Sequence, residues 1–193
     1  FVDLAGEYVV ELRVVDHFGA PSPSELCPAD AVRVRIKAVP SEKLHIQLTW
    51  DTPSDEDQTD DMGTDVDLHL RHPQGTSWFG FDGFDCYFEN KNPDWGRPGE
   101  SSDDPSLDID DVNGAGPENI NIARPQNTST LGGGYQVGVH YFAVDDFSGE
   151  GDLGGVDSTA RIRIYVDGQV AYEEERRLTA TNDFWYVGDV QVS

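Results

Sequence analysis

Apolar and polar side chains alternate with a period of two residues along almost the whole chain, and no segment has a convincing helical period. This period is typical of a β-strand that buries one face and exposes the other. Such strands, separated by loops rich in Gly, Pro, Asn and Asp, predict an all-β fold, an antiparallel β-sandwich with jelly-roll or immunoglobulin-like character. We expect strands at residues 10–14, 32–37, 44–50, 66–70, 135–141, 162–166, 170–172 and 184–192, with a hairpin turn at 167–168.

A proline and two charged residues interrupt this pattern at residues 39–43, "VPSEK", and predict a domain boundary. Only two strands are expected upstream, which is too few to bury a core. We therefore predict a partial segment at residues 1–40 and a complete domain at 41–193. Because the chain begins at Phe1 without Met, we expect a processed protein or a piece of a longer one. The two strands would be completed either within the molecule or by a neighbouring one.

The chain is strongly acidic, with 37 Asp+Glu against 13 Lys+Arg and a formal net charge of -24. Such a surface repels nucleic acid and anionic membranes, so that cations are its natural partners. No apolar run approaches the roughly 20 residues of a membrane-spanning helix, and no signal peptide is evident. For most of the carboxylates, the simplest interpretation is a solvated surface suited to a salty medium.

Two cysteines, Cys27 and Cys86, allow one internal disulfide. It would close a loop of about 60 residues, which a chain-entropy argument values at about 4 kcal/mol. We expect this disulfide, and with it an extracellular or cell-surface location. The alternatives are two buried thiols or a pair of metal ligands, although neither cysteine lies in a CxxC motif.

The N-terminal segment resembles a known module. "LAGEYVVELRVVDHFGAPSP" followed by "AVRVRIKAV" resembles the closing hairpin of a bacterial PKD-type, immunoglobulin-like domain. The resemblance covers residues 1 to about 39 and implies the last two strands of a domain whose beginning is missing.

Residues 42–193 resemble a secreted bacterial β-sandwich domain of unknown function found in large surface proteins. The resemblance lies in a D-x-D-L-H strand, a D-x-D-x-x-x-G-x-G-P-E-N loop and a V-H-Y-F strand. It implies an extracellular, calcium-associated module of a multidomain protein, and it carries no enzymatic activity.

The same segments predict a metal site on chemical grounds. Alternation from residue 65 to 71 places Asp65, Asp67 and His69 on one face, with the two carboxylates about 7 Å apart. Asp108 and Asp110 repeat this spacing. Oxygen ligands in an irregular loop suit calcium, although the EF-hand spacing fails. The predicted calcium ligands are Asp65, Asp67, Asp108, Asp110, Glu118 and Asp51.

Two alternatives remain for these acidic segments. The loop at residues 108–118, with Gly114 and Gly116, could be an Asx-rich turn whose side chains bond to their own backbone. The run "DTPSDEDQTDDMGTD" at 51–65 is interpreted as a flexible solvated loop, with a cap on the same metal site or a separate metal site as the alternatives. Asp51 is its most informative member, because it directly follows an expected strand.

Aromatic side chains crowd into residues 78–95. Trp78 and Trp95 would stack on sugar rings if they were exposed near calcium, which indicates a carbohydrate-binding module as the alternative function. If they are buried, they plug one end of the sandwich around Cys86.

Enzyme motifs are missing from the sequence: there is no HExxH and no G-x-S-x-G. His69 and His140 fall on the polar faces of expected strands, where a surface or supporting role is ordinary. We therefore predict no enzyme, but a non-catalytic, extracellular calcium-binding structural or adhesive module of a larger secreted or cell-surface protein, including a subunit of a fibre. Its expected partners are cations, other surface-protein domains, copies of itself, or extracellular polysaccharide.

Overall fold

A computed structural model describes residues 4–20, 32–55, 58, 63–80, 82–112, 114–145 and 156–193. The chain divides into two compact units, Phe1–Val39 and Pro40–Ser193, and each is described by itself.

The first unit is a single antiparallel strand pair. β1 (Gly6–Leu12) pairs with β2 (Val32–Ala38) in a register that runs from Gly6 opposite Ala38 to Leu12 opposite Val32. Two strands have no second layer against which to pack. Large apolar side chains of this unit are consequently exposed, among them Val9, Val10, Leu12, Val34 and Ile36.

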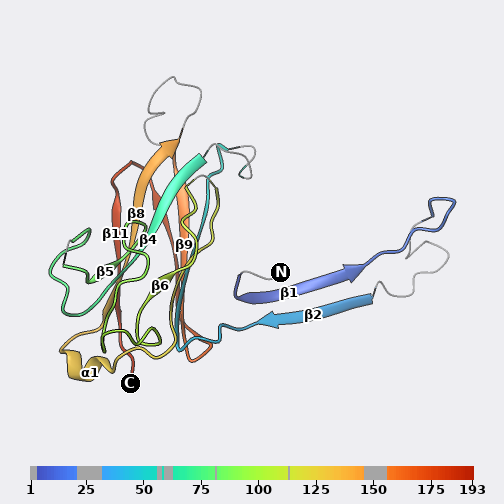
Figure 1. Cartoon of the computed structure of the whole chain (residues 1–193). Coiled ribbons are helices and arrows are strands. Elements are labelled where there is room, and N and C mark those ends of the chain that lie inside the picture. The colour runs from blue at the N-terminus through green and yellow to red at the C-terminus, as the bar shows by residue number, and fades with distance from the viewer. Residues whose placement is uncertain are drawn as a thin grey trace. The chain divides into compact units, whose positions relative to one another are not determined.

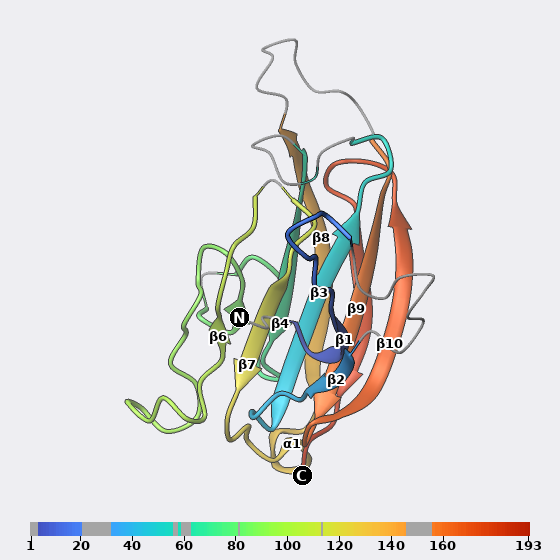
Figure 2. The same cartoon turned by 90° about the vertical axis from the view of Figure 1, so that its right-hand side faces the viewer.

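The second unit consists of two antiparallel sheets, which confirms the predicted all-β, sandwich-like fold (Figure 1). Figure 2 shows strands of the five-stranded sheet in front of strands of the four-stranded one. The five-stranded sheet has the order β10 (Gln169–Leu178), β9 (Ser158–Val166), β3 (Leu44–Asp51), β7 (Glu118–Ile122) and β6 (Ser106–Leu107). The four-stranded sheet has the order β11 (Phe184–Val190), β8 (Tyr135–Asp145), β4 (Gly63–Arg71) and β5 (Asp85–Cys86).

The hydrophobic core lies between these sheets and follows the predicted alternation. On β3, Leu44, Ile46, Leu48 and Trp50 are all buried. The indole Nε1 of Trp50 donates to the carbonyl oxygen of Thr64 at 3.0 Å, so that the polar edge of this core residue has a partner. The other strands supply Val66, Leu68, Leu70, Ile120, Ile122, Val137, Val139, Tyr141, Ile162 and Ile164.

The connections contain little regular structure. One short helix, α1 (Thr128–Leu131), begins after Asn127, whose side chain accepts the Ser129 N–H, and ends at Gly132. Among the described residues, no helix has the length and apolar character needed to cross a membrane. The strands β5, β6 and β7 were not expected from the sequence, because two of them are two residues long and the third follows an acidic loop.

The predicted disulfide between Cys27 and Cys86 is not found among the described residues. Cys86 is a free, buried thiol on β5, and its Sγ donates to the carbonyl oxygen of Lys91 at 3.4 Å. Burial raises the pKa of this thiol far above its ordinary value, so the thiolate is disfavoured. Cys27 lies outside the described residues. The thiol of Cys86 is therefore part of the core, where protein atoms cover it.

Candidate metal centre

Strand β4 carries the central side chains of the site. Its inward residues belong to the core, as predicted, but the opposite side chains are also buried. Asp67 is 2% exposed and His69 is 0% exposed. Because the outer face of a sheet normally meets water, something must cover this one.

The segment between β4 and β5, together with Tyr87 directly after β5, provides the cover. The ring centroids of Phe79 and Tyr87 lie 4.6 Å and 4.9 Å from that of His69. Trp78 lies over the neighbouring strand, since a Cβ added to Gly138 would come within 3.2 Å of the Trp78 ring and 2.5 Å of Phe184. The glycine thus leaves the space that lets aromatic rings settle on the sheet, and they exclude water from β4.

Three carboxylates meet at the edge of β4. Oxygen atoms of Asp67, Asp110 and Glu118 all lie within 4.8 Å of one another. Asp67 and Glu118 are buried, whereas Asp110 is partly exposed. The three residues come from β4, from the loop after β6 and from the start of β7. We name this group the carboxylate cluster.

Glu118 connects the two sheets. Its Oε2 accepts the backbone N–H of Leu68 on β4 at 2.7 Å, and its Oε1 accepts the N–H of Asp111 at 3.2 Å. Strand β5 pairs with β4 only at Leu70 and Arg71, so the Leu68 N–H lies beyond the end of β5. Glu118 satisfies this edge donor from the opposite sheet.

A close backbone approach places Glu118 there. Gly116 has a φ of 80°, and a Cβ at this position would lie 2.9 Å from the ring of Trp50. The neighbouring residue, Ala115, also contacts Trp50: the carbonyl oxygen of Ala115 accepts the backbone N–H of Trp50 at 3.0 Å. Glycine is required at residue 116 for both reasons.

One cation partly balances the carboxylate cluster. The Nζ of Lys91 lies 3.1 Å from Oδ2 of Asp110. Burial raises the pKa of Glu118 well above its ordinary value, and the charges of Asp67 and Asp110 raise it further, while the Leu68 and Asp111 N–H groups lower it. The cluster therefore holds more carboxylates than the nearby protein cation neutralises.

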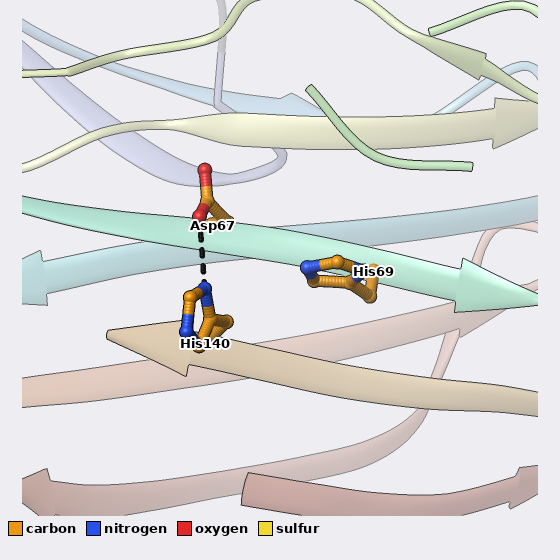
Figure 3. A group of neighbouring side chains, drawn as sticks. All are labelled: Asp67, His69 and His140. Carbon is orange, nitrogen blue, oxygen red and sulfur yellow. Dashed lines mark hydrogen bonds and ion pairs between the residues drawn. The ribbon is translucent and has the colours of Figure 1, made fainter. Parts of the chain in front are cut away.

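A second group shares Asp67 with the first. Ligand atoms of Asp67, His69 and His140 lie within 4.8 Å of one another, and all three residues are buried (Figure 3). His140 lies opposite Asp67 in the β4–β8 register, and its Nδ1 is 3.2 Å from Oδ2 of Asp67. We name this group the histidine cluster.

Asp85 holds His69 from behind. The Nδ1 of His69 is 3.0 Å from Oδ2 of Asp85, which also accepts the Phe79 N–H at 2.8 Å. No described residue gives a hydrogen bond to Nε2 of His69, although this atom is buried. Figure 3 shows the far end of the His69 ring turned toward Asp67 and His140. The site thus contains a buried nitrogen that has no partner and faces a carboxylate and a second imidazole.

The structure brings together three of the six predicted calcium ligands, namely Asp67, Asp110 and Glu118. Asp51 is exposed and accepts a hydrogen bond from Nε2 of Gln58 at 3.0 Å. Asp65 is buried beside the bulge on β8 and belongs to neither cluster.

Asp108, a predicted ligand, bonds to Ile109 and Asn119 and lies outside the carboxylate cluster. Its Oδ1 accepts the backbone N–H groups of Ile109 at 2.7 Å and Asn119 at 3.0 Å, and its Oδ2 accepts Nδ2 of Asn119. This carboxylate fixes its own loop to the start of β7, and it belongs to neither cluster.

Sequence reasoning missed the histidines and Asp85 as members of a site. Alternation correctly put His69 and His140 on the outer face, and outer-face residues are expected to meet solvent. The aromatic density of residues 78–88 was the available signal that this face is covered.

The two tryptophans predicted for sugar stacking are packed into the protein. Trp95 is 2% exposed, stacks on Tyr135 at a centroid distance of 6.0 Å, and donates from Nε1 to the carbonyl oxygen of Gly83. Trp78 is half-buried between Phe184 and the guanidinium of Arg71, which lies 4.6 Å from its ring. Trp95 therefore offers no ring face to a sugar, and the rings pack on the sandwich.

The fold defines the class as an antiparallel, sandwich-like β protein, and the donor atoms define two adjoining groups. The carboxylate cluster is all oxygen and fits a hard cation such as calcium, while the histidine cluster adds imidazole nitrogen. No protein-family model matches the chain, and searches of curated proteins and of solved structures give no match.

Proposed function

We propose that this protein is a non-catalytic, calcium-binding β-sandwich module of a larger secreted or cell-surface protein, with a structural or adhesive role. The observation that carries the proposal is the carboxylate cluster, in which Asp67, Asp110 and Glu118 place oxygens within 4.8 Å of one another. Asp67 is distant in the sequence from Asp110 and Glu118, so its convergence with them is a product of the fold.

A calcium ion at the carboxylate cluster would tie the sandwich together. Asp67 belongs to the four-stranded sheet and Glu118 to the five-stranded sheet, so an ion bound to both would link the layers at their edge. Asp110 would add the loop that precedes β7. Calcium accepts carboxylates in irregular geometry, together with carbonyl oxygens and water, which suits a site built partly from a loop.

Electrostatics favours a cation at this position. A buried carboxylate without a counterion is costly, and this cluster has two buried carboxylates and a third that is partly exposed. The net charge of the chain, -24, draws cations to its surface in addition. Extracellular modules bind calcium weakly, with dissociation constants of about 0.1–1 mM. At ten times its dissociation constant, calcium would stabilise the fold by about 1.4 kcal/mol.

Burial of the histidines supports a non-catalytic role. His140 is 6% exposed and His69 lies under aromatic rings, so the described residues leave little of either imidazole open to a substrate in solution. The resemblance to secreted surface domains supports the location, and the exposed apolar residues of the β1–β2 pair support association with another domain or another copy.

The decisive experiment is calcium titration of the metal-free chain by calorimetry, combined with thermal melting in calcium and in chelator. We expect binding in the millimolar range or tighter and a higher Tm in calcium. Glu118→Gln should remove both effects, because it deletes a buried ligand charge. Asp51→Asn is the matched control, since it removes an exposed carboxylate outside the cluster.

The proposal fails if calcium produces neither heat nor a change in Tm, or if Glu118→Gln and Asp51→Asn respond to calcium alike. Sedimentation of the same samples tests the structural role: assembly that depends on calcium should lose its large species in chelator.

A further inference from the structure

We propose that Asp67, His69 and His140 bind a divalent transition metal ion, with zinc as the ion that suits this ligand set best. Two imidazoles and one carboxylate are ligands that zinc and its neighbours prefer, whereas calcium prefers oxygen alone. This site differs from the proposed calcium site because it contains two histidines, and the two groups have only Asp67 in common.

The unpartnered nitrogen of His69 is the strongest observation. The His69 side chain is 0% exposed, and no described residue bonds to its Nε2. If Nδ1 donates its proton to Asp85, Nε2 is a buried lone pair without a donor. If the ring is doubly protonated, Nε2–H is a buried donor without an acceptor. In the neutral ring with its proton on Nδ1, a metal ion that binds the Nε2 lone pair gives this buried atom a partner.

His69 is oriented by a carboxylate in the way that metal-binding histidines commonly are. In metal sites, a ligating imidazole commonly donates its second ring N–H to a carboxylate, which fixes the tautomer and the ring orientation. Asp85 occupies this place, at 3.0 Å from Nδ1 of His69. Asp85 is itself held by the N–H of Phe79 at 2.8 Å, so that both members are oriented before any ion arrives.

The spacing of the other two ligands fits a small ion. A tetrahedral zinc ion holds its ligand atoms at about 2.0–2.1 Å, which places them roughly 3.4 Å apart. Nδ1 of His140 and Oδ2 of Asp67 are 3.2 Å apart, which is close to this spacing. The ligand atom of His69 lies within 4.8 Å of both, so a small shift of its ring would complete the set. For Nδ1 of His140 to bind the ion, the ring proton must lie on Nε2, so the metal would replace the hydrogen bond between Nδ1 and Oδ2 of Asp67.

The surroundings indicate a structural ion. The rings of Phe79, Tyr87 and Phe184 surround His69, with centroids 4.6–5.7 Å away. An ion at this place would hold β4 to β8 beneath the aromatic cover.

The test begins with the full chain, freed of metal by chelator and then titrated with zinc by calorimetry, with zinc content measured after dialysis. We expect one zinc ion per chain at micromolar concentration. His69→Gln and His140→Gln should each abolish this binding. Asp85→Asn should weaken it by about 10- to 100-fold, because it removes only the support.

His45→Gln is the matched control, because His45 is another buried histidine that contacts Asn121 and belongs to neither cluster. It should bind zinc as the unaltered chain does. Glu118→Gln separates the two proposals: it should lose calcium and keep zinc, whereas His69→Gln should lose zinc and keep calcium.

Spectra of the unaltered chain keep the proposal testable if a variant fails to fold. Cobalt(II) should give the intense visible bands of a four-coordinate ion, and zinc should shift the imidazole nitrogen signals of His69 and His140 but not those of His45. Absence of stoichiometric zinc, or zinc binding that survives in both histidine variants, would overturn the proposal and leave a water molecule as the partner of Nε2.

Discussion

The two sheets of the sandwich treat their outer faces differently. On β9 and β10, the outward side chains are ion pairs open to solvent, such as Arg163 Nε with Glu173 Oε1 at 3.1 Å. On β4 and β8, the outward side chains include Asp67, His69 and His140, which are buried, and the ring of Phe79 lies against both imidazoles. The same alternation of polar and apolar residues therefore produces a water-exposed surface in one place and a buried polar group in another.

This difference teaches what a polar side chain contributes in each setting. Exposed ion pairs are screened by water and salt, and each contributes roughly 1 kcal/mol or less. A buried charge must be paired or bound to an ion, and loss of its partner is expensive. The covered face should thus be sensitive to substitution and the open face tolerant of it.

The largest effect is expected from Asp67→Asn. The substitution removes the carboxylate that both clusters share and leaves the buried His140 without its charged partner. Leaving a buried polar group without its partner costs about 1–3 kcal/mol, and more when the partner is charged, so we expect about 3 kcal/mol in urea unfolding without metal. Glu173→Gln on the open face is the control and should cost at most about 1 kcal/mol. Equal losses in the two variants would abolish the distinction between the faces.

The next effect concerns pH and His72, which follows β4 and is 1% exposed. Burial lowers its pKa from 6.5 to about 4. Between pH 6.5 and 4, the unfolded chain binds a proton at His72 that the folded chain does not bind. The contribution of His72 to the free energy of unfolding is therefore complete above pH 6.5 and is lost as the pH falls toward 4. The difference corresponds to about 3 kcal/mol.

His72→Gln should flatten this part of the stability curve, measured by urea unfolding in chelator at intervals from pH 7 to 4. If the variant and the unaltered chain lose the same free energy over that interval, the pKa of His72 is not lowered, and the rings of Phe84, Trp95 and Tyr135 leave its imidazole open to water.

The smallest effect tests how tightly the cover fits. Gly138→Ala would bring a methyl group to 2.5 Å from Phe184 and 3.2 Å from Trp78, and rearranging these rings should cost about 1–2 kcal/mol. Gly133→Ala is the matched control, because its new methyl group would meet only Pro73, at 3.7 Å. Thermal melting of the pair should separate them by several degrees. A Tm for Gly138→Ala equal to that of the control would mean that the rings move freely.

Sequence alone predicts the strands because the polarity of each side chain indicates whether it faces the core or the solvent. Leu44, Ile46 and Leu48 point inward as alternation requires. The short strands β5 and β6 escape such reasoning, since two residues carry no period. Their positions depend on pairing with residues distant in the sequence.

The candidate site was only partly predictable for a related reason. Composition identifies acidic residues, but only the fold decides which of them converge. Asp108 and Asp110 look equivalent in the sequence, yet Asp108 binds the backbone of Asn119 while Asp110 turns to Asp67 and Glu118. Pairing of His69 with Asp85 spans a loop whose path no local pattern specifies.

The charged residues of the edge strand β10 affect how two molecules can associate at high concentration. It lies at the end of the five-stranded sheet, where unpaired backbone groups invite another strand. Its exposed run Glu173, Glu174, Glu175, Arg176 and Arg177 places charge along that border. A second sandwich that approached edge to edge would have to strip water from all of these charges. Even at high local concentration, this border should resist fusion into a continuous intermolecular sheet.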